Sequence, residues 1–189
     1  MFLSITAIKR SVILSLSKSN SMKNITASFL VLLISISVFG QQSKSKTLAE
    51  TFSATSPDGA TFDLTELRGK VVLVTFWSTK CPICHVVIPK LNQLARNYKD
   101  KNVVFPGLTM ENPNKVQSYL KKKPFDFNII PNSFGVVLKY SDKDGDGNVS
   151  MGFPAHFLIN QKGEIALQTS GFDKTELLDS RISQLLKTK

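Results

Sequence analysis

The chain of 189 residues has room for one medium-sized domain and a processing segment, but not for two full domains. Its content of 42% hydrophobic and 20% charged residues argues against global disorder. The formal net charge is +10, yet no basic stripe is interleaved with aromatic residues, which argues against a nucleic-acid-binding protein.

The N-terminal region has the layout of an export signal. The first forty residues contain no acidic side chain. From Met22 onward, the basic Lys23 precedes an apolar run over 25–39, and small residues follow near Gly40. This order of a positive end, an apolar stretch and a small-residue cleavage site is typical of a secretory signal peptide. The run is shorter than the roughly 20 residues that span a bilayer.

The chain therefore divides into three predicted parts. These are an export segment over 1–40, translated from Met1 or Met22, a linker over 41–47 and a folded domain over 48–189. We expect the folded domain to be exported to the periplasm. The alternative is a domain that stays tethered to the membrane because the N-terminal segment is not cleaved.

Patterns in the first half of the domain predict a hairpin, a buried strand and a helix. Short segments at 51–53 and 61–64 flank Ser56-Pro57-Asp58-Gly59, which is typical of a hairpin turn. Residues 71–77 form a nearly unbroken β-branched and aromatic run, which suits a central strand buried on both faces. An amphipathic helix follows, with an apolar side made of Val87, Leu91, Leu94, Ala95 and Tyr98.

The second half adds further strands and two helices. A strand is predicted over 103–108, with Pro106 at a sheet edge or a bulge because proline cannot donate a ladder hydrogen bond. It is followed by a helix over 114–122, antiparallel strands over 154–159 and 164–169, and a last helix opened by a capping box of Asp173 and Glu176. This order predicts an α/β fold: a central mixed sheet flanked by helices, with the N-terminal hairpin as an extension.

The two cysteines, Cys81 and Cys84, carry the strongest chemical signal. A bridge between residues three apart closes almost no loop, so it cannot serve as a structural staple. The pair lies where the buried strand gives way to the helix, and Pro82 fits the first helical turn. Free backbone N–H groups, the helix dipole and neighbouring Lys80 favour a thiolate at the first cysteine. We therefore predict Cys81 as the nucleophile and Cys84 as the resolving thiol.

Three stretches resemble the TlpA/ResA branch of the thioredoxin superfamily. They are Trp77–Cys84 with Pro89-Lys90-Leu91, then Gly152–Asn160, then Lys162–Ile165. The likeness covers about residues 48–188 and implies a thioredoxin-like fold and a thiol–disulfide oxidoreductase, usually a reductase, whose only redox group is its own disulfide. The implied partners are exported proteins with disulfides or thiols, apocytochrome c among them, and a membrane thiol reductant. We expect a monomer.

The same resemblance implies further site residues. Pro154 is expected to be a cis-proline facing the dithiol, and Phe153 before it is expected to offer backbone groups to an extended substrate segment. Trp77, Lys80 and Pro82, which surround the cysteines, complete the implied substrate-binding set. No metal ligand is implied.

Three positions depart from the family's pattern. Lys80 stands where members often have a Trp, and Val87 stands where many have a Glu. Thr75 occupies the place of the buried acid that relays protons in thioredoxin itself. The missing carboxylates leave open how the Cys84 thiol is deprotonated. His156, two residues after the implied cis-proline, points either toward the dithiol or elsewhere in the sheet.

The run Cys81–His85 also matches Cys-X-X-Cys-His, the attachment motif of c-type haem. An exported electron-transfer cytochrome is therefore an alternative function, with Met110, Met151 or His156 as candidate axial ligands. A non-catalytic thioredoxin-fold binding module with incidental thiols is a second alternative. The oxidoreductase is favoured because the motif ends a strand within an α/β order of elements.

The segment 142–148 resembles the first half of a calcium loop. Asp142, Asp144 and Asp146 supply oxygens at the first, third and fifth positions, and a glycine holds the sixth. The twelfth position is Phe153 instead of the bidentate Glu that such loops use. A Gly/Asp turn is therefore the favoured interpretation, and calcium is the alternative.

Overall fold

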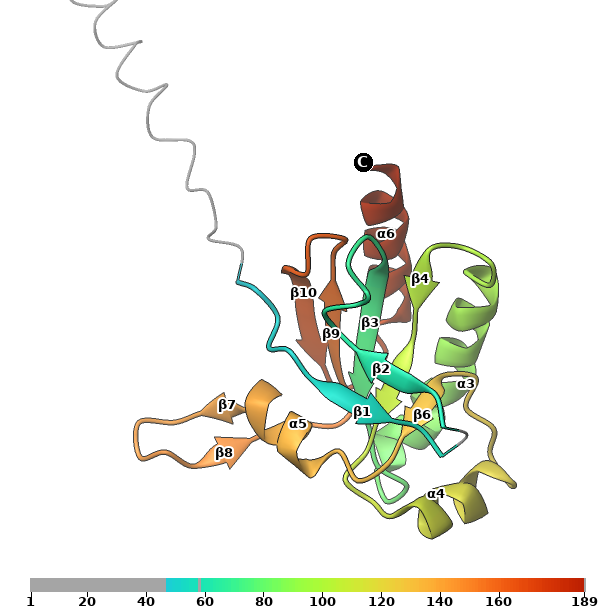
Figure 1. Ribbon diagram of the computed structural model, residues 1–189. Helices are drawn as coiled ribbons and strands as arrows, with labels where there is room; N and C mark the ends of the chain where they lie inside the picture. Colours follow the sequence, from blue (N-terminus) through green and yellow to red (C-terminus); the bar gives the residue numbers. More distant parts are fainter. Residues whose placement is uncertain (1–46, 58, 189) are drawn as a thin grey trace, which may run out of the picture. The chain divides into compact units, whose positions relative to one another are not determined.

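The computed structural model describes residues 47–57 and 59–188 (Figure 1). A six-stranded sheet has the order β10-β9-β3-β5-β6, with β4 also paired to β3, and β1-β2 and β7-β8 form two small separate sheets. The strands are β1 (Ser53–Thr55), β2 (Thr61–Asp63), β3 (Val71–Phe76), β4 (Val103–Val104), β5 (Pro106–Leu108), β6 (Asn128–Ile130), β7 (Asp142–Lys143), β8 (Val149–Ser150), β9 (Ala155–Ile159) and β10 (Ile165–Ser170). The helices are α3 (Pro82–Asn97), α4 (Pro113–Leu120), α5 (Phe134–Tyr140) and α6 (Thr175–Lys187).

The predicted export segment, 1–40, lies outside the described residues, as do residues 41–46 of the predicted linker. From Thr47 onward the chain is attached to the central sheet, because the carbonyl of Thr47 accepts a hydrogen bond from Ile165 N at 2.8 Å. Within the described part of the chain, no helix combines the length and apolar character needed to span a bilayer.

Strand β3 lies at the centre of the sheet because its sequence tolerates burial on both faces. All six of its residues are buried. It pairs in parallel with β4 and β5, and antiparallel with β9, whose five residues are also buried. The predicted buried strand and the predicted mixed sheet are therefore confirmed.

Two apolar layers form on the two faces of the sheet. Alternate residues of β3 take part in different layers, because successive side chains of a strand point to opposite faces. Val71 and Leu73 pack with α3 and α6, whereas Val72 and Val74 pack with residues of α5 and of the N-terminal hairpin region. The hairpin β1-β2, predicted from its turn sequence, crosses the sheet in Figure 1.

The strand predicted over 103–108 is split, and of the two placements predicted for Pro106, a sheet edge or a bulge, the sheet edge is wrong. β4 ends at Val104 and β5 begins at Pro106, so the chain is interrupted at Phe105. β5 lies between β3 and β6. Proline is tolerated at this interior position because the hydrogen bond between the two strands runs from Asn128 N to the carbonyl of Phe105, at 2.9 Å. It therefore needs no N–H from Pro106.

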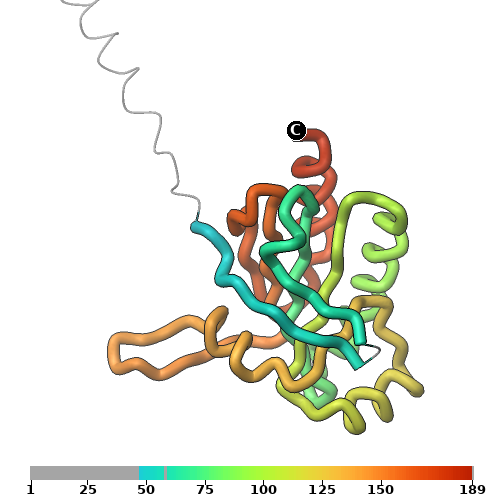
Figure 2. The backbone as a smooth tube through the Cα atoms, in the orientation of Figure 1, coloured from blue at the N-terminus to red at the C-terminus, as the bar shows by residue number. Residues whose placement is uncertain are grey.

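Two features in the second half of the domain differ from the expectation, whereas a third, the Asp/Gly segment, forms the turn that is the favoured interpretation. β6 and α5 are additional short elements. The Asp/Gly segment is the turn of the hairpin β7-β8, which extends away from the sheet (Figure 2). The predicted capping box does not form: α6 has Lys174 at its N-cap position without a side-chain cap, and the Asp173 carboxylate accepts hydrogen bonds from N and Oγ1 of Thr175.

Candidate active site

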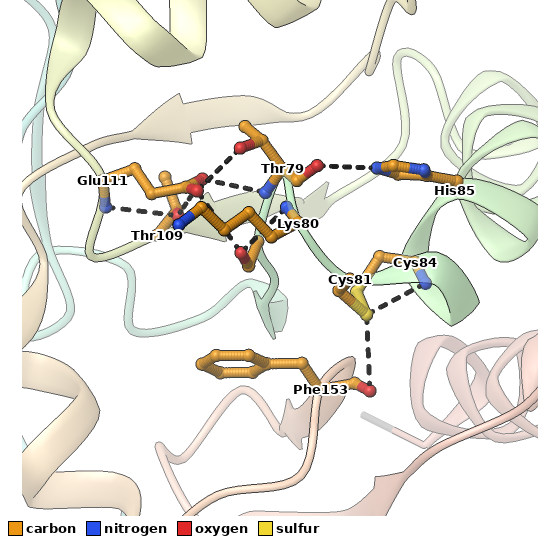
Figure 3. The surroundings of a disulfide bond; sticks show 9 residues. Thr79, Lys80, Cys81, Cys84, His85, Thr109, Glu111 and Phe153 are labelled. Atoms are coloured by element: carbon orange, nitrogen blue, oxygen red, sulfur yellow. Dashed lines mark hydrogen bonds between the residues drawn. A yellow bond between two sulfur atoms is a disulfide. The ribbon is translucent and has the colours of Figure 1, made fainter.

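The centre of the site is a disulfide between Cys81 and Cys84 at the start of α3 (Figure 3). The loop 77–80 connects it to the end of β3. Cys81 is the N-cap residue of α3, and Pro82 occupies the first turn, where its missing N–H leaves no hydrogen bond unmade. The Cα atoms of the two cysteines are 5.2 Å apart, so one helical turn brings both sulfurs within bonding reach.

The two sulfurs have different surroundings. Cys81 is partly exposed, whereas Cys84 is fully buried in the apolar layer beneath α3. Cys81 Sγ accepts a hydrogen bond from Cys84 N at 3.1 Å. Once the disulfide is reduced, this N–H and the helix N-terminus would both stabilise negative charge on Cys81. The geometry therefore distinguishes an accessible sulfur, with a donor directed at it, from an enclosed one.

The loop before β9 approaches the disulfide from the other side. The carbonyl oxygen of Phe153 lies 3.6 Å from Cys81 Sγ, as Figure 3 shows. The Phe153–Pro154 peptide bond is cis, and the carbonyl of Pro154 accepts a hydrogen bond from Gly171 N at 2.9 Å. This backbone is thus placed beside the accessible sulfur.

The other residues predicted to bind substrate fall into two groups. Lys80 and Pro82 are exposed beside the disulfide. Trp77 is only 1% exposed, and its ring packs against Tyr119 and Phe125, with centroids 5.5 and 5.4 Å away. The structure therefore gives Trp77 a place in the core, where it offers no surface to a substrate.

Glu111, which the sequence reasoning did not select, holds the loop that precedes the disulfide. Its carboxylate accepts hydrogen bonds from Thr79 N at 2.8 Å, Thr79 Oγ1 at 2.6 Å and Lys115 Nζ at 2.6 Å. Burial by itself would raise the pKa of Glu111, but these bonds outweigh it and lower the pKa to about 2. The sequence could have indicated this contact. Glu111 follows β5 and Thr79 follows β3, and because these strands are parallel neighbours, both residues lie at the same edge of the sheet.

His85 fixes the same loop from the helix side. Its Nε2 lies 2.8 Å from the carbonyl oxygen of Thr79, and its ring packs near Tyr119 with centroids 5.3 Å apart. Because a carbonyl only accepts, Nε2 carries the hydrogen in this bond. Thr79 is therefore held by Glu111 on one side and His85 on the other, two residues before Cys81.

The surroundings of the Cys-X-X-Cys-His motif do not fit a covalently attached haem. The motif's histidine, His85, would bind iron through a ring nitrogen, but its Nε2 is engaged with the backbone of Thr79. Of the candidate axial ligands, His156 is fully buried within the sheet. The two sulfurs are bonded to each other, whereas thioether attachment would use both.

The segment considered for calcium is organised by its own hydrogen bonds. The carboxylate of Asp144 accepts bonds from Asp146 N at 3.0 Å, and from Asn148 N and Nδ2 at 2.8 and 2.9 Å. Asp142 lies in β7. Over residues 47–57 and 59–188, no group of three or more His, Cys, Asp or Glu side chains is placed to hold a metal ion.

Glu111→Gln is expected to remove an acid-dependent part of the stability. The folded-state pKa of about 2 lies below the ordinary value of 4.5, so the stabilisation is complete above pH 4.5 and is lost as the pH falls through 2. We expect the wild-type protein to exceed the variant by roughly 2 kcal/mol near pH 6, with the gap closing below pH 4.5. Urea unfolding over this pH range measures it. Glu66→Gln, at an exposed acid, is the control, and a gap independent of pH would contradict the assignment.

A redox-active disulfide at the N-terminus of the helix that follows a central buried strand defines a thiol–disulfide oxidoreductase of the thioredoxin fold. The chain belongs to the Redoxin family, whose model matches residues 42–186. The family resemblance, the fold class and the enzyme class predicted from the sequence are thereby confirmed.

Two relatives and one solved structure illustrate the likeness. The chain is 25% identical over 138 residues to the thiol-disulfide oxidoreductase ResA of Bacillus thuringiensis, covering 72% of this chain and 76% of the relative. It is 33% identical over 87 residues to the soluble secreted antigen MPT53 of Mycobacterium tuberculosis, covering 46% and 49%. The crystal structure of a thiol:disulfide interchange protein of the thioredoxin family from Chlorobium tepidum matches with a TM-score of 0.65 at 23% identity, over 76% of this chain and 99% of that one.

Proposed function

We propose that this protein is an exported disulfide reductase that acts on the cysteines of other exported proteins. The observation that carries the proposal is the asymmetry of the disulfide: Cys81 is accessible, with a backbone donor aimed at its sulfur, and Cys84 is enclosed one helical turn away. In the reduced protein this arrangement supplies one thiolate to attack a partner and a second thiol to release it.

The reaction proceeds in two exchange steps. The Cys81 thiolate attacks a substrate disulfide, a bond forms between Cys81 Sγ and one substrate sulfur, and the other substrate sulfur leaves as a thiolate. Cys84 then attacks Cys81 Sγ, the intramolecular disulfide forms, and the second substrate thiolate leaves. The substrate gains two electrons and the protein loses two. A membrane thiol reductant returns the protein to its dithiol form.

The surface around Cys81 supports a protein substrate. Phe153 places a carbonyl 3.6 Å from the sulfur, where an extended segment of a partner can reach the same backbone. Lys80 and Pro82 are exposed on the other side, and Ile83 and Val86 of α3 are 39% and 57% exposed. Exposed apolar side chains beside a reactive group favour binding of a polypeptide segment over a small charged molecule. Apocytochrome c thiols before haem attachment are within this substrate class.

Export is supported by the sequence and by one relative. The signal-peptide layout from Met22 to Gly40 predicts passage across the membrane. The mycobacterial relative is a secreted protein by its name. A dithiol that reduces partners outside the cytoplasm must work where disulfides form and persist, which fits a periplasmic location.

The reduction potential of the Cys81–Cys84 couple tests both the exchange and its direction. We expect the oxidised protein to equilibrate with glutathione buffers at a potential more negative than about −200 mV, nearer to thioredoxin at about −270 mV than to the oxidant DsbA at about −120 mV. Thiol alkylation and mass spectrometry at each buffer ratio give the value. A potential near −120 mV would contradict the reductase direction. A disulfide that does not exchange with glutathione would favour the binding-module alternative.

A further inference from the structure

A buried polar pair lies inside the sheet on the same side as the resolving cysteine. Thr75 of β3 and His156 of β9 are opposite each other in the antiparallel register, and both are fully buried. Thr75 Oγ1 and His156 Nδ1 are 3.0 Å apart. The other ring nitrogen, Nε2, is buried and has no hydrogen-bond partner among the described residues.

The alternation of side chains places this pair beneath α3. Leu73 and Leu158, two residues from Thr75 and His156 on their strands, belong to the apolar layer that encloses Cys84. Residues two apart on a strand share a face, so the pair faces that layer as well. The Thr75–His156 pair also lies toward the end of the sheet that carries the disulfide. β9 starts directly after Pro154, and the carbonyl of the preceding Phe153 contacts Cys81.

His156 is neutral under ordinary conditions. Burial lowers its pKa to about 4, so at neutral pH one ring nitrogen bears a hydrogen and the other accepts. If Nδ1–H donates to Thr75 Oγ1, the unpartnered Nε2 is the free acceptor.

No charged group on the neighbouring elements opposes the lowering of the His156 pKa by burial. Its register neighbours, Thr75 and Thr169, are uncharged. On α3, His85 bonds to Thr79, Lys90 pairs with Asp173 and Arg96 pairs with Asp126. On α6, Asp179 accepts a bond from Tyr98 and Arg181 donates to Gln184, whereas Glu176 and Lys187 are exposed to solvent.

We propose that His156 accepts the proton of Cys84 when this thiol resolves the mixed disulfide. The inference rests on the proposed function, since it concerns its second exchange step. As the Cys84 S–H bond breaks, the proton moves to His156, the sulfur attacks Cys81 Sγ, and the substrate thiolate leaves. His156 then returns the proton to the departing thiolate, so the step turns the Cys84 thiol and the mixed disulfide into the Cys81–Cys84 disulfide and a substrate thiol. Thr75 cannot perform this step because its hydroxyl is far too weak a base.

The test separates the two steps by mixing the reduced protein with an aromatic disulfide whose released thiol is coloured. The first equivalent of colour reports attack by Cys81, and the second reports resolution by Cys84. In His156→Gln, whose amide can still bond to Thr75 but cannot take up a proton, we expect the second phase at pH 7 to slow about a hundredfold. The first phase should change by less than about twofold, since Cys81 does not depend on this base. Thr75→Val, which keeps the imidazole, is the matched control and should slow the second phase far less.

The pH profile distinguishes a proton acceptor from a packing role. Because hydroxide can replace the missing base, the second phase of His156→Gln should become faster as the pH is raised. Adding Thr75→Asp to this variant should restore a base within the pair and speed up the second phase. A second phase that is unchanged, or slowed equally at every pH, would overturn the proposal. If the Gln variant does not fold, His156→Leu is used for the same comparison, since its apolar side chain suits the surrounding apolar layer. Absence of the first phase in the wild-type protein would instead contradict the proposed function itself.

Discussion

Replacement of Cys81 by Ser is expected to lower the rate of disulfide exchange with a protein substrate by at least about a thousandfold, because it removes the accessible one of the chain's two cysteine thiols. Cys84 cannot replace it, since its side chain is fully buried beneath α3. A serine hydroxyl at position 81 is not ionised at neutral pH and does not attack disulfides. Dithiothreitol-driven reduction of a disulfide-bonded protein, followed by turbidity or thiol release, measures the effect.

Two comparisons make this result interpretable. Denaturant unfolding of the variant and of the reduced wild-type protein should give similar stabilities, since neither of them contains the Cys81–Cys84 disulfide. Lys99→Gln, at an exposed lysine just beyond the far end of α3, should retain most of the activity. Exchange by Cys81→Ser at more than a tenth of the wild-type rate would mean that Cys84 reaches substrates directly and that the assigned roles are reversed.

Local patterns predicted the elements that position the site. The apolar run before the cysteines is β3, and the three- and four-residue spacing after them is α3. The two predicted last strands are β9 and β10, and Gly163 in the turn between them adopts a φ of +77° that favours glycine. These features could be predicted because each is specified within one short stretch of chain.

Other parts of the fold depend on distant partners and could not be predicted. β6 has three residues and α5 has seven, too few for a periodic pattern to stand out. Proline in a strand is normally a signal of a sheet edge or a bulge, and the edge alternative for Pro106 is wrong. Its tolerance in β5 depends on which partner donates the hydrogen bond, and this is fixed by the register with β6.

The site also combines features that a short stretch of sequence predicts with features that depend on distant residues. The reactive pair follows from cysteine spacing and from its place between a strand and a helix. The supports of the site come from elsewhere in the chain: Glu111 lies 32 residues after Thr79, and His156 lies 81 residues after Thr75. The run over 71–77 predicted a buried Trp77, whereas the family resemblance placed Trp77 in the substrate-binding set; the structure has it buried against α4.

Cys81 is expected to form mixed disulfides with exported proteins, and Cys84 is expected to release them. The most direct measurement is to express Cys84→Ser, quench free thiols in acid, and separate the exported fraction by non-reducing electrophoresis. Without its resolving thiol, the protein should accumulate reducible adducts in which mass spectrometry maps the bond to Cys81. Cys81→Ser in the same background should show none of them. Adducts on exported proteins are the predicted result; a Cys84→Ser protein that stays free of adducts, or is joined to partners through another residue, would contradict the account.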